Sequence, residues 1–156
     1  MAVIEAARNM LNIKNASSSE FGNNCTPVVG LIEEWQKGKK IFKGSEKDLG
    51  GTMRLGLYDA IIKNNSLISK IYSEKRIKER HRHRYEVNPS FHSKLKQHGL
   101  ILSGLSPDGK LVEIIELKKH KWFLACQFHP EFKSKPFLSH PLFKGFIKAS
   151  TDSKND

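Results

Sequence analysis

Cysteine is scarce in this sequence of 156 residues: Cys25 and Cys126 are its two examples. Two cysteines cannot build a disulfide framework, which favours a reducing compartment. No apolar run approaches the roughly 18 residues of a membrane-spanning helix, and the charged N-terminus does not resemble a signal peptide. The sequence therefore predicts a cytoplasmic protein without membrane contact.

Acidic residues are also in the minority, because 16 acidic side chains stand against 27 basic ones, for a formal net charge of +11. This charge favours polyanionic surroundings but indicates no fold. A Gly-rich phosphate loop of Walker type is absent, so nucleotide hydrolysis is not indicated. Helix-turn-helix, zinc-finger and RNP-like aromatic patterns are absent too, which makes nucleic-acid binding an unlikely function.

Apolar residues recur at helical and strand spacings in alternation along the chain, within a length that fits one domain. The spacing predicts helices over 2–13, 61–72 in part, 88–95 and 141–149. Strands are predicted over 27–32, 53–57, 79–87, 100–105, 110–117 and 122–128. Residues 15–24 are expected to form a loop, 37–47 an exposed turn or lid, and 150–156 a polar tail. Strands interleaved with helices predict an α/β fold.

The segment from Gln127 to Phe132 places His129 and Glu131 on either side of Pro130, at the end of a predicted buried strand. Proline fixes φ near −65°, so the two side chains project from a stiffened backbone. A carboxylate that accepts from one imidazole nitrogen leaves the other free to activate a nucleophile. Catalytic residues in α/β proteins often follow strand ends, which favours a catalytic pair over a chance surface pair.

Neither cysteine is placed as the nucleophile that such a pair would serve. Cys126 precedes His129 by three positions, so on a strand it should face the other way, roughly 10 Å along the strand. Cys25 lies in a polar loop without the strand–turn–helix elbow that exposes a nucleophile. Cys126 is most simply a small core residue.

Arginine alternates with histidine or tyrosine between Glu79 and Glu86. In an extended chain one face carries Arg80, Arg82 and Arg84, and the other carries His81, His83 and Tyr85. An arginine face can bind a carboxylate or phosphate through paired hydrogen bonds. The alternative is a solvated basic edge strand. The flanking guanidinium groups disfavour a cation at the histidines, so no metal site is predicted.

Three segments together resemble one family: Gly50–Gly56, Glu79–Glu86 and Gln127–Phe132. They are similar to the glutaminase domain of CTP synthases, which is a class I glutamine amidotransferase domain. Leu111–Glu116 and His140–Phe143 also match its bacterial members. The resemblance runs from about Ala2 to Ala149, and the order of the three motifs makes it strong.

The resemblance implies specific roles. His129 corresponds to the catalytic base and Glu131 to the acid that orients it. Glu20 corresponds to a residue that holds the substrate glutamine, and Arg84 to the arginine that receives its carboxylate. In the family a cysteine forms a thioester with glutamine, and the released ammonia reaches a synthase domain where ATP-activated UTP becomes CTP. No cofactor is expected in this chain, because ATP and Mg²⁺ act in the synthase domain.

The resemblance also implies a departure, because the family's nucleophilic cysteine directly precedes the helix predicted to begin at Ala2. We therefore expect an incomplete class I glutamine amidotransferase fold over 1–149: a mixed sheet flanked by helices. The expected fragment lacks the nucleophile elbow, the N-terminal strands and the synthase domain. Such a fragment should be inactive alone, because His129 would have no thiol to activate.

Two alternatives stay open. Another polypeptide that carries the elbow and the synthase domain could restore glutaminase activity in trans. A function of another class is a non-catalytic module that binds RNA or another polyanion, for which binding should weaken steeply with salt. Its candidate residues are Arg80, Arg82, Arg84 and the cluster Lys118-Lys119-His120-Lys121.

Overall fold

The computed structural model describes residues 1–22, 24–31 and 53–152, which form two compact units. The first unit comprises Met1–Leu55 with Arg82–Leu100, and the second comprises Gly56–His81 with Ile101–Asp156. The predicted turn or lid over 37–47 and the glycine pair at 50–51 lie outside the described residues. In the described part of the chain, no helix is long and apolar enough to cross a membrane.

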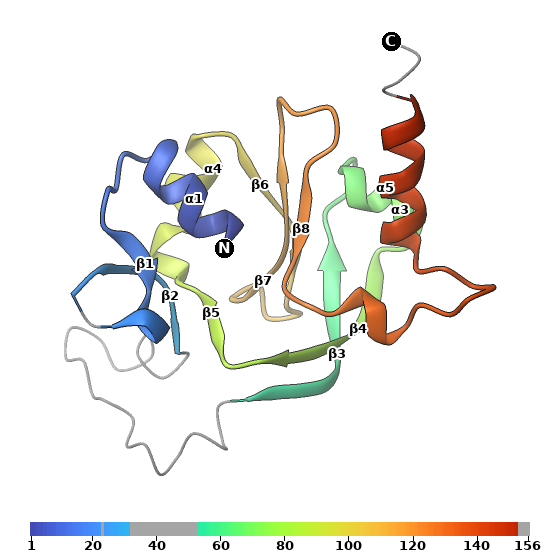
Figure 1. Ribbon diagram of the computed structural model, residues 1–156, viewed down its shortest axis with the longest axis horizontal. Helices are drawn as coiled ribbons and strands as arrows, with labels where there is room; N and C mark the ends of the chain where they lie inside the picture. The colour runs from blue at the N-terminus through green and yellow to red at the C-terminus, as the bar shows by residue number, and fades with distance from the viewer. Residues whose placement is uncertain (23, 32–52, 153–156) are drawn as a thin grey trace. The chain divides into compact units, whose positions relative to one another are not determined.

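The first unit contains a three-stranded sheet of order β1-β2-β5 (Figure 1). β1 and β2 pair in parallel, whereas β2 and β5 pair antiparallel. Its elements are α1 (Ala2–Asn9), β1 (Ala16–Ser18), η1 (Ser19–Phe21), β2 (Thr26–Leu31), β5 (Tyr85–Val87), η3 (Pro89–Phe91) and α4 (His92–Gln97). The first unit is therefore built on a short mixed sheet.

The core of the first unit lies between α1 and the sheet. Ile4 and Ala7, which are three positions apart on one helix face, pack with Ala16 and Val28. The prediction of a loop over 15–24 is wrong in part, because β1 and η1 lie there. Ala16 is fully buried and pairs with Thr26, a non-local contact that overrides the polar local sequence.

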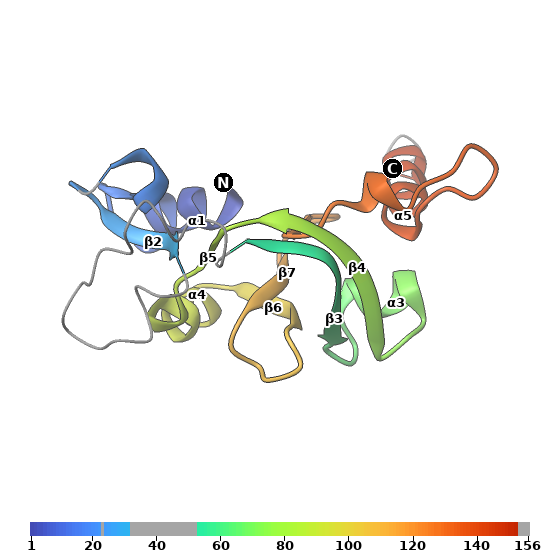
Figure 2. The ribbon, with the colours of Figure 1, turned by 90° about the horizontal axis from the view of Figure 1, so that it is seen from below.

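The second unit contains a five-stranded sheet of order β4-β3-β6-β7-β8. β3 pairs antiparallel with β6, as β7 does with β8, and Figure 2 shows the curved β3 and β4 side by side. Its elements are β3 (Arg54–Ile62), α3 (Leu67–Tyr72), β4 (Arg76–His83), β6 (Leu100–Leu105), β7 (Val112–Leu117), β8 (Leu124–Cys126), η4 (Pro130–Phe132) and α5 (Pro141–Asp152). The two units together confirm the predicted mixed α/β fold.

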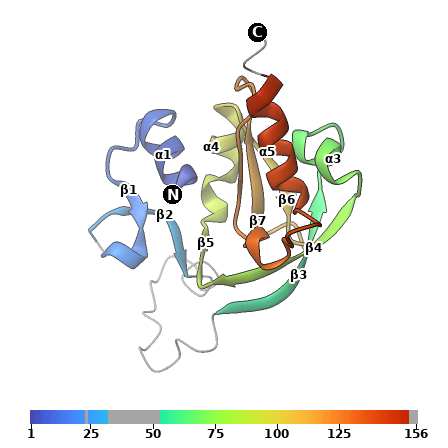
Figure 3. The same cartoon turned by 45° about the vertical axis from the view of Figure 1, so that its right-hand side comes forward.

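Helices α3 and α5 pack on the apolar core of the second unit, which includes Ile77, Ile114 and Phe128. The N-terminus of α3 receives the Glu116 carboxylate from β7, since the N–H groups of the first two helical residues each donate to it at 2.9 Å. α5 lies beside α3 (Figure 3), and the glycine at 145 permits this approach because a Cβ there would lie 3.1 Å from Ile71.

The turn predicted at Ser106–Gly109 joins β6 to β7. The Gly109 N–H donates to the Ser106 carbonyl at 2.8 Å, and Gly109 adopts φ +73°, which glycine tolerates best. The two strands approach closely at Gly104, where a Cβ would lie 2.7 Å from Cγ1 of Ile114. This region therefore follows the local turn signal in the sequence.

Several element bounds differ from the predictions. β3 continues to Ile62, so the partial helix predicted within 61–72 is α3 alone. The strand predicted over 79–87 divides at Arg84 into β4 and β5, and the strand predicted over 122–128 is the three-residue β8. α5 extends to Asp152, where Ser150 and Thr151 bond back to carbonyls of the preceding turn.

Candidate active site

A one-turn helix, η4, follows β8 and carries the two predicted catalytic side chains. Pro130 occupies its first turn, where a missing N–H costs nothing, and the N–H of Phe132 donates to the His129 carbonyl at 3.2 Å. The turn directs both side chains to one side, so that Nδ1 of His129 lies 2.7 Å from Oε1 of Glu131. The spacing of the two residues in the sequence therefore becomes a direct contact.

The pair between His129 and Glu131 is open to solvent: their side chains are 36% and 55% exposed. The hydrogen bond from His129 lowers the pKa of Glu131 below its ordinary value, which keeps this carboxylate ionised. Phe132 stacks on the imidazole with ring centroids 5.1 Å apart and limits its rotation. With Nδ1 held by the carboxylate, Nε2 is the nitrogen that can meet a reactant.

A buried polar cluster lies next to η4 in the same unit. One carboxylate oxygen of Glu79, on β4, lies 2.9 Å from the Tyr72 hydroxyl, 3.1 Å from Nε2 of His140 and 3.3 Å from Nζ of Lys133. Burial alone would raise the pKa of Glu79, but the hydrogen bonds from His140 and Tyr72 outweigh burial and lower it. Burial, with the nearby Glu79 charge, raises the pKa of Tyr72.

Residues of this cluster were not among the sequence candidates. Ile77, Glu79 and His81 alternate with exposed basic residues along β4, and the three are buried. That period of two was a signal that Glu79 points inward, but His140 is 61 positions away and no local pattern joins the two. The arginines that alternate with these residues were the more conspicuous pattern in the sequence.

Arg84 lies at the bend between β4 and β5, in the first unit. Among the described residues its Nη1 is buried and has no hydrogen-bond partner. A buried guanidinium nitrogen without a partner is costly, and a carboxylate ligand would satisfy it. Arg80 and Arg82 are exposed on β4, an edge strand of the described sheet, as in the solvated-edge interpretation.

Glu20 lies in η1 of the first unit, exposed to solvent. Its backbone N–H donates to the Ser18 hydroxyl at 3.3 Å, which starts the short helix and leaves the carboxylate to point outward. Within the described chain, no hydrogen bond or ion pair joins Glu20 to Arg84. The structure thus brings His129 and Glu131 together in the second unit and places Glu20 and Arg84 in the first.

Both cysteines are free thiols, and neither has the features of an activated nucleophile. Burial, with the charges of Glu79 and Glu131, raises the pKa of Cys126 to about 12, and its thiol donates to the Phe128 carbonyl. The Cys25 thiol lies 3.4 Å from the Gly22 carbonyl, and strand β2 follows it rather than a helix. The nucleophile-elbow geometry is therefore absent at both positions.

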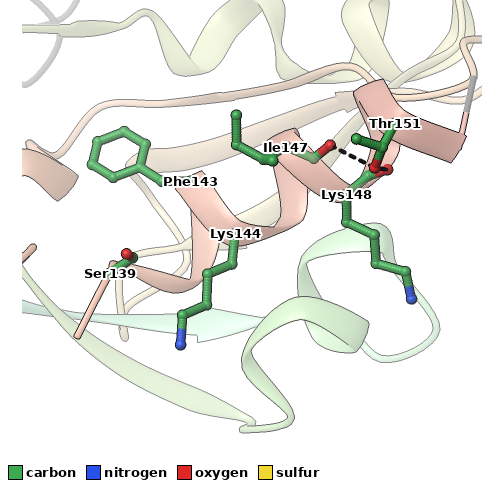
Figure 4. Close-up of a pocket in the computed structure, with 6 residues that line it drawn as sticks. All are labelled: Ser139, Phe143, Lys144, Ile147, Lys148 and Thr151. Carbon is green, nitrogen blue, oxygen red and sulfur yellow. Dashed lines mark hydrogen bonds between the residues drawn. The ribbon is translucent and has the colours of Figure 1, made fainter. Parts of the chain in front are cut away.

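A shallow hollow of about 450 Å³ lies along α5 in the second unit, and Figure 4 shows its lining. Its lining residues are Ser139, Phe143, Lys144, Ile147, Lys148 and Thr151, so neither His129 nor Glu131 contributes. Within residues 1–22, 24–31 and 53–152, no group of three or more His, Cys, Asp or Glu side chains could hold a metal ion.

Residues 18–149 match the family model described as glutamine amidotransferase class-I. The chain is 64% identical over 154 residues to the CTP synthase of Pelagibacter ubique, a match that covers 99% of this chain and 29% of that protein. It is 56% identical over 151 residues to the CTP synthase of Hyphomonas neptunium, covering 96% and 28%. The chain thus spans less than a third of the length of these relatives.

A solved structure supports the same relationship. The glutaminase domain of Trypanosoma brucei CTP synthase, with bound acivicin, is 34% identical and superposes with a TM-score of 0.81. The superposition covers 97% of this chain and 56% of that one. The chain therefore matches the glutaminase part of CTP synthases in both sequence and fold.

Proposed function

Since this chain belongs to the class-I glutamine amidotransferase family, we propose that it is the glutamine-hydrolysing part of a CTP synthase. His129 is the general base of this reaction and Glu131 is the carboxylate that orients it. The substrate is the side-chain amide of glutamine, and the product passed on is ammonia.

The observation that carries this proposal is the contact of 2.7 Å between Nδ1 of His129 and Oε1 of Glu131. An ionised carboxylate at Nδ1 stabilises the tautomer with its proton on Nδ1 and a lone pair on Nε2. Nε2 of His129 can then take the proton of a thiol. The exposure of the pair gives substrate and thiol access to it.

The reaction proceeds in two stages. A thiol loses its proton to Nε2 of His129, and the thiolate attacks the amide carbon of glutamine. The imidazolium returns the proton to the amide nitrogen, which leaves as ammonia, and a thioester forms. Water activated by the same imidazole then cleaves the thioester to glutamate and restores the thiol.

Arg84 and Glu20 bind the other end of glutamine in this proposal. The buried Nη1 of Arg84 suits the α-carboxylate, since a guanidinium pairs with a carboxylate through directed hydrogen bonds. The exposed carboxylate of Glu20 suits the α-ammonium group by charge. These two residues set specificity, whereas His129 and Glu131 carry out the chemistry.

The nucleophilic thiol is proposed to lie outside these 156 residues, on a polypeptide that carries the elbow and the synthase domain. The raised pKa of Cys126 and the strand that follows Cys25 support this, because neither thiol suits the reaction. Without that polypeptide the chain is proposed to be inactive. The superposition covers 56% of the solved chain, so the rest of that chain has no counterpart among these residues and could correspond to the part that carries the thiol.

In this assignment no cofactor binds the present chain, since the family's ATP and Mg²⁺ act at the synthase domain, where UTP is converted to CTP. The free state of both cysteines agrees with a cytoplasmic location.

The proposal is tested by measuring ammonia release from glutamine after the purified chain is mixed with a polypeptide that supplies the elbow and the synthase domain. We expect release from the mixture and none from either part alone. His129→Gln should reduce release by several orders of magnitude, because the proton acceptor is lost. His98→Gln is the matched control, since His98 is an exposed histidine at the end of α4.

Release that survives His129→Gln would contradict the assigned role of the imidazole. Glutamine turnover by the chain alone that persists after Cys25→Ser and Cys126→Ser would contradict the cysteine mechanism. Failure of the mixture to release ammonia, despite demonstrated assembly of the two polypeptides, would count against restoration in trans.

A further inference from the structure

We propose that Lys133 is a positioning residue, which acts with Glu79 to hold η4 in the geometry where His129 and Glu131 pair. The effect of Lys133 on catalysis rests on the function proposed above, whereas its effect on the geometry of η4 does not. The inference comes from how η4 is attached to β4 at both of its ends.

The start of η4 is attached through the main chain. The backbone N–H of His129 donates to the carbonyl of Arg80 at 2.8 Å. This bond attaches the segment after β8 to the edge strand β4. It fixes the backbone of His129 at the start of η4.

The end of η4 is attached through one side chain. Lys133 directly follows the helix, and its Nζ donates to the carbonyl of Lys78 at 2.6 Å and to Oε1 of Glu79 at 3.3 Å. The acceptors at the two ends of η4 therefore belong to three consecutive residues of β4. Between the two attachment points lie Pro130, Glu131 and Phe132.

Glu79 is a rigid acceptor because its surroundings fix it. It is 1% exposed and also receives hydrogen bonds from Tyr72 and His140. The backbone N–H of Leu142 donates to Nδ1 of His140 at 3.3 Å. The ring proton of His140 therefore resides on Nε2 and points to Glu79. Lys133 is thus tied to the buried core rather than to a mobile surface group.

The side chain of Glu131 is held by its hydrogen bond to His129. Its side chain is 55% exposed, so packing cannot set its position, and η4 is only three residues long. A misplacement of about 1 Å at an active site can cost on the order of 10²-fold in rate. Attachment at both ends by groups outside the reaction is how a short turn can hold a catalytic contact.

The test is the tautomer of the His129 imidazole, measured by ¹⁵N NMR of the ¹⁵N-histidine-labelled chain at alkaline pH. The protein as it stands should show the proton mainly on Nδ1, facing Glu131. Lys133→Met should reduce the ratio of the Nδ1–H to the Nε2–H tautomer by roughly ten-fold, the size expected when a charge-assisted hydrogen bond is lost. Lys133→Arg, which can still donate to β4, should restore the ratio.

Lys135→Met is the matched control, because Lys135 is an exposed lysine of the same loop and its backbone exchanges two hydrogen bonds with that of Leu138. It should leave the ratio unchanged. Glu79→Gln is the second variant: it removes the charge that holds Lys133 and should lower the ratio in the same direction.

An unchanged ratio in both Lys133→Met and Glu79→Gln overturns the proposal. So does a Lys133→Met chain that fails to fold, since the residue would then be a structural support. If the ratio falls as expected but the reconstituted mixture releases no ammonia, the positioning role stands and the proposed function fails. Normal ammonia release with an unchanged ratio removes the positioning role alone.

Discussion

Two glutamate–histidine pairs in the described part of the second unit lie in contrasting environments. Glu131 and His129 lie 2.7 Å apart with side chains 55% and 36% exposed, whereas Glu79 and His140 lie 3.1 Å apart and are 1% and 2% exposed. The exposed pair has one bond between its members and faces solvent. The buried pair shares its carboxylate with a tyrosine and a lysine.

The environment of each pair, rather than its residue types, therefore separates a reactive pair from a structural one. In the buried pair, hydrogen bonds occupy both ring nitrogens of His140, so neither can accept a proton from a substrate. In the exposed pair, one nitrogen is held and the other is directed away from the carboxylate. Lys133, which we propose to position the exposed pair, donates to Glu79 of the buried pair.

The largest expected effect is on stability. Glu79→Ala should lower the free energy of unfolding by about 3–5 kcal/mol, because it leaves the buried Tyr72 hydroxyl and His140 ring without their acceptor. Glu131→Ala should cost about 0–1 kcal/mol, as expected for an exposed pair. Denaturant unfolding of both variants measures these two losses, and equal losses would contradict the difference between the buried and the exposed pair.

The buried pair should also make the stability of the chain depend on pH in the acidic range. The pKa of Glu79 is lowered in the folded chain, so its contribution is present above the unfolded pKa and is lost as pH falls through the folded pKa. Glu79→Gln should remove on the order of one proton of uptake from the acid unfolding transition. Stability measured as a function of pH in the acidic range tests this, and an unchanged slope would contradict it.

A smaller effect is expected from removing a single hydroxyl. Tyr72→Phe deletes one of the three donors to Glu79 but leaves His140 and Lys133 in place. We expect a loss of roughly 1 kcal/mol, the usual net worth of one hydrogen bond. Thermal unfolding measures it. A loss as large as that of Glu79→Ala would mean that the tyrosine, not the carboxylate, organises the cluster.

The smallest effect is expected on the pKa of Cys126, which the carboxylates of both pairs raise. Burial contributes most to its raised pKa, followed by the charge of Glu79 and then that of Glu131. Glu131→Gln should lower the thiol pKa by less than about one unit, and Glu79→Gln should lower it more. The pH dependence of alkylation in a Cys25→Ser background measures both shifts. A larger shift from Glu131→Gln than from Glu79→Gln would contradict the stronger influence of the Glu79 charge on this thiol.

The sequence predicted the exposed pair because its information is local. His129 and Glu131 are two residues apart around a proline, and the stiffened turn brings the side chains together as expected. The α/β class and the turn at Ser106–Gly109 were also predicted correctly, from periodicity and turn residues.

The buried pair could not be predicted in the same way. Glu79 and His140 are 61 positions apart, and their contact depends on how the segment before α5 returns to β4. β1 was missed for a similar reason, because its pairing with β2 joins Ala16 to Thr26 across a polar stretch. Non-local pairing overrides local propensity at both places.

We propose that Glu131 orients His129 for glutamine hydrolysis. The most direct measurement is ammonia release by the reconstituted mixture with Glu131→Gln, alongside its free energy of unfolding. We expect a fall in kcat of about 10²–10⁴-fold with stability nearly unchanged, since the imidazole loses its orienting charge while the core is untouched. Ammonia release equal to that of the unsubstituted chain would contradict it.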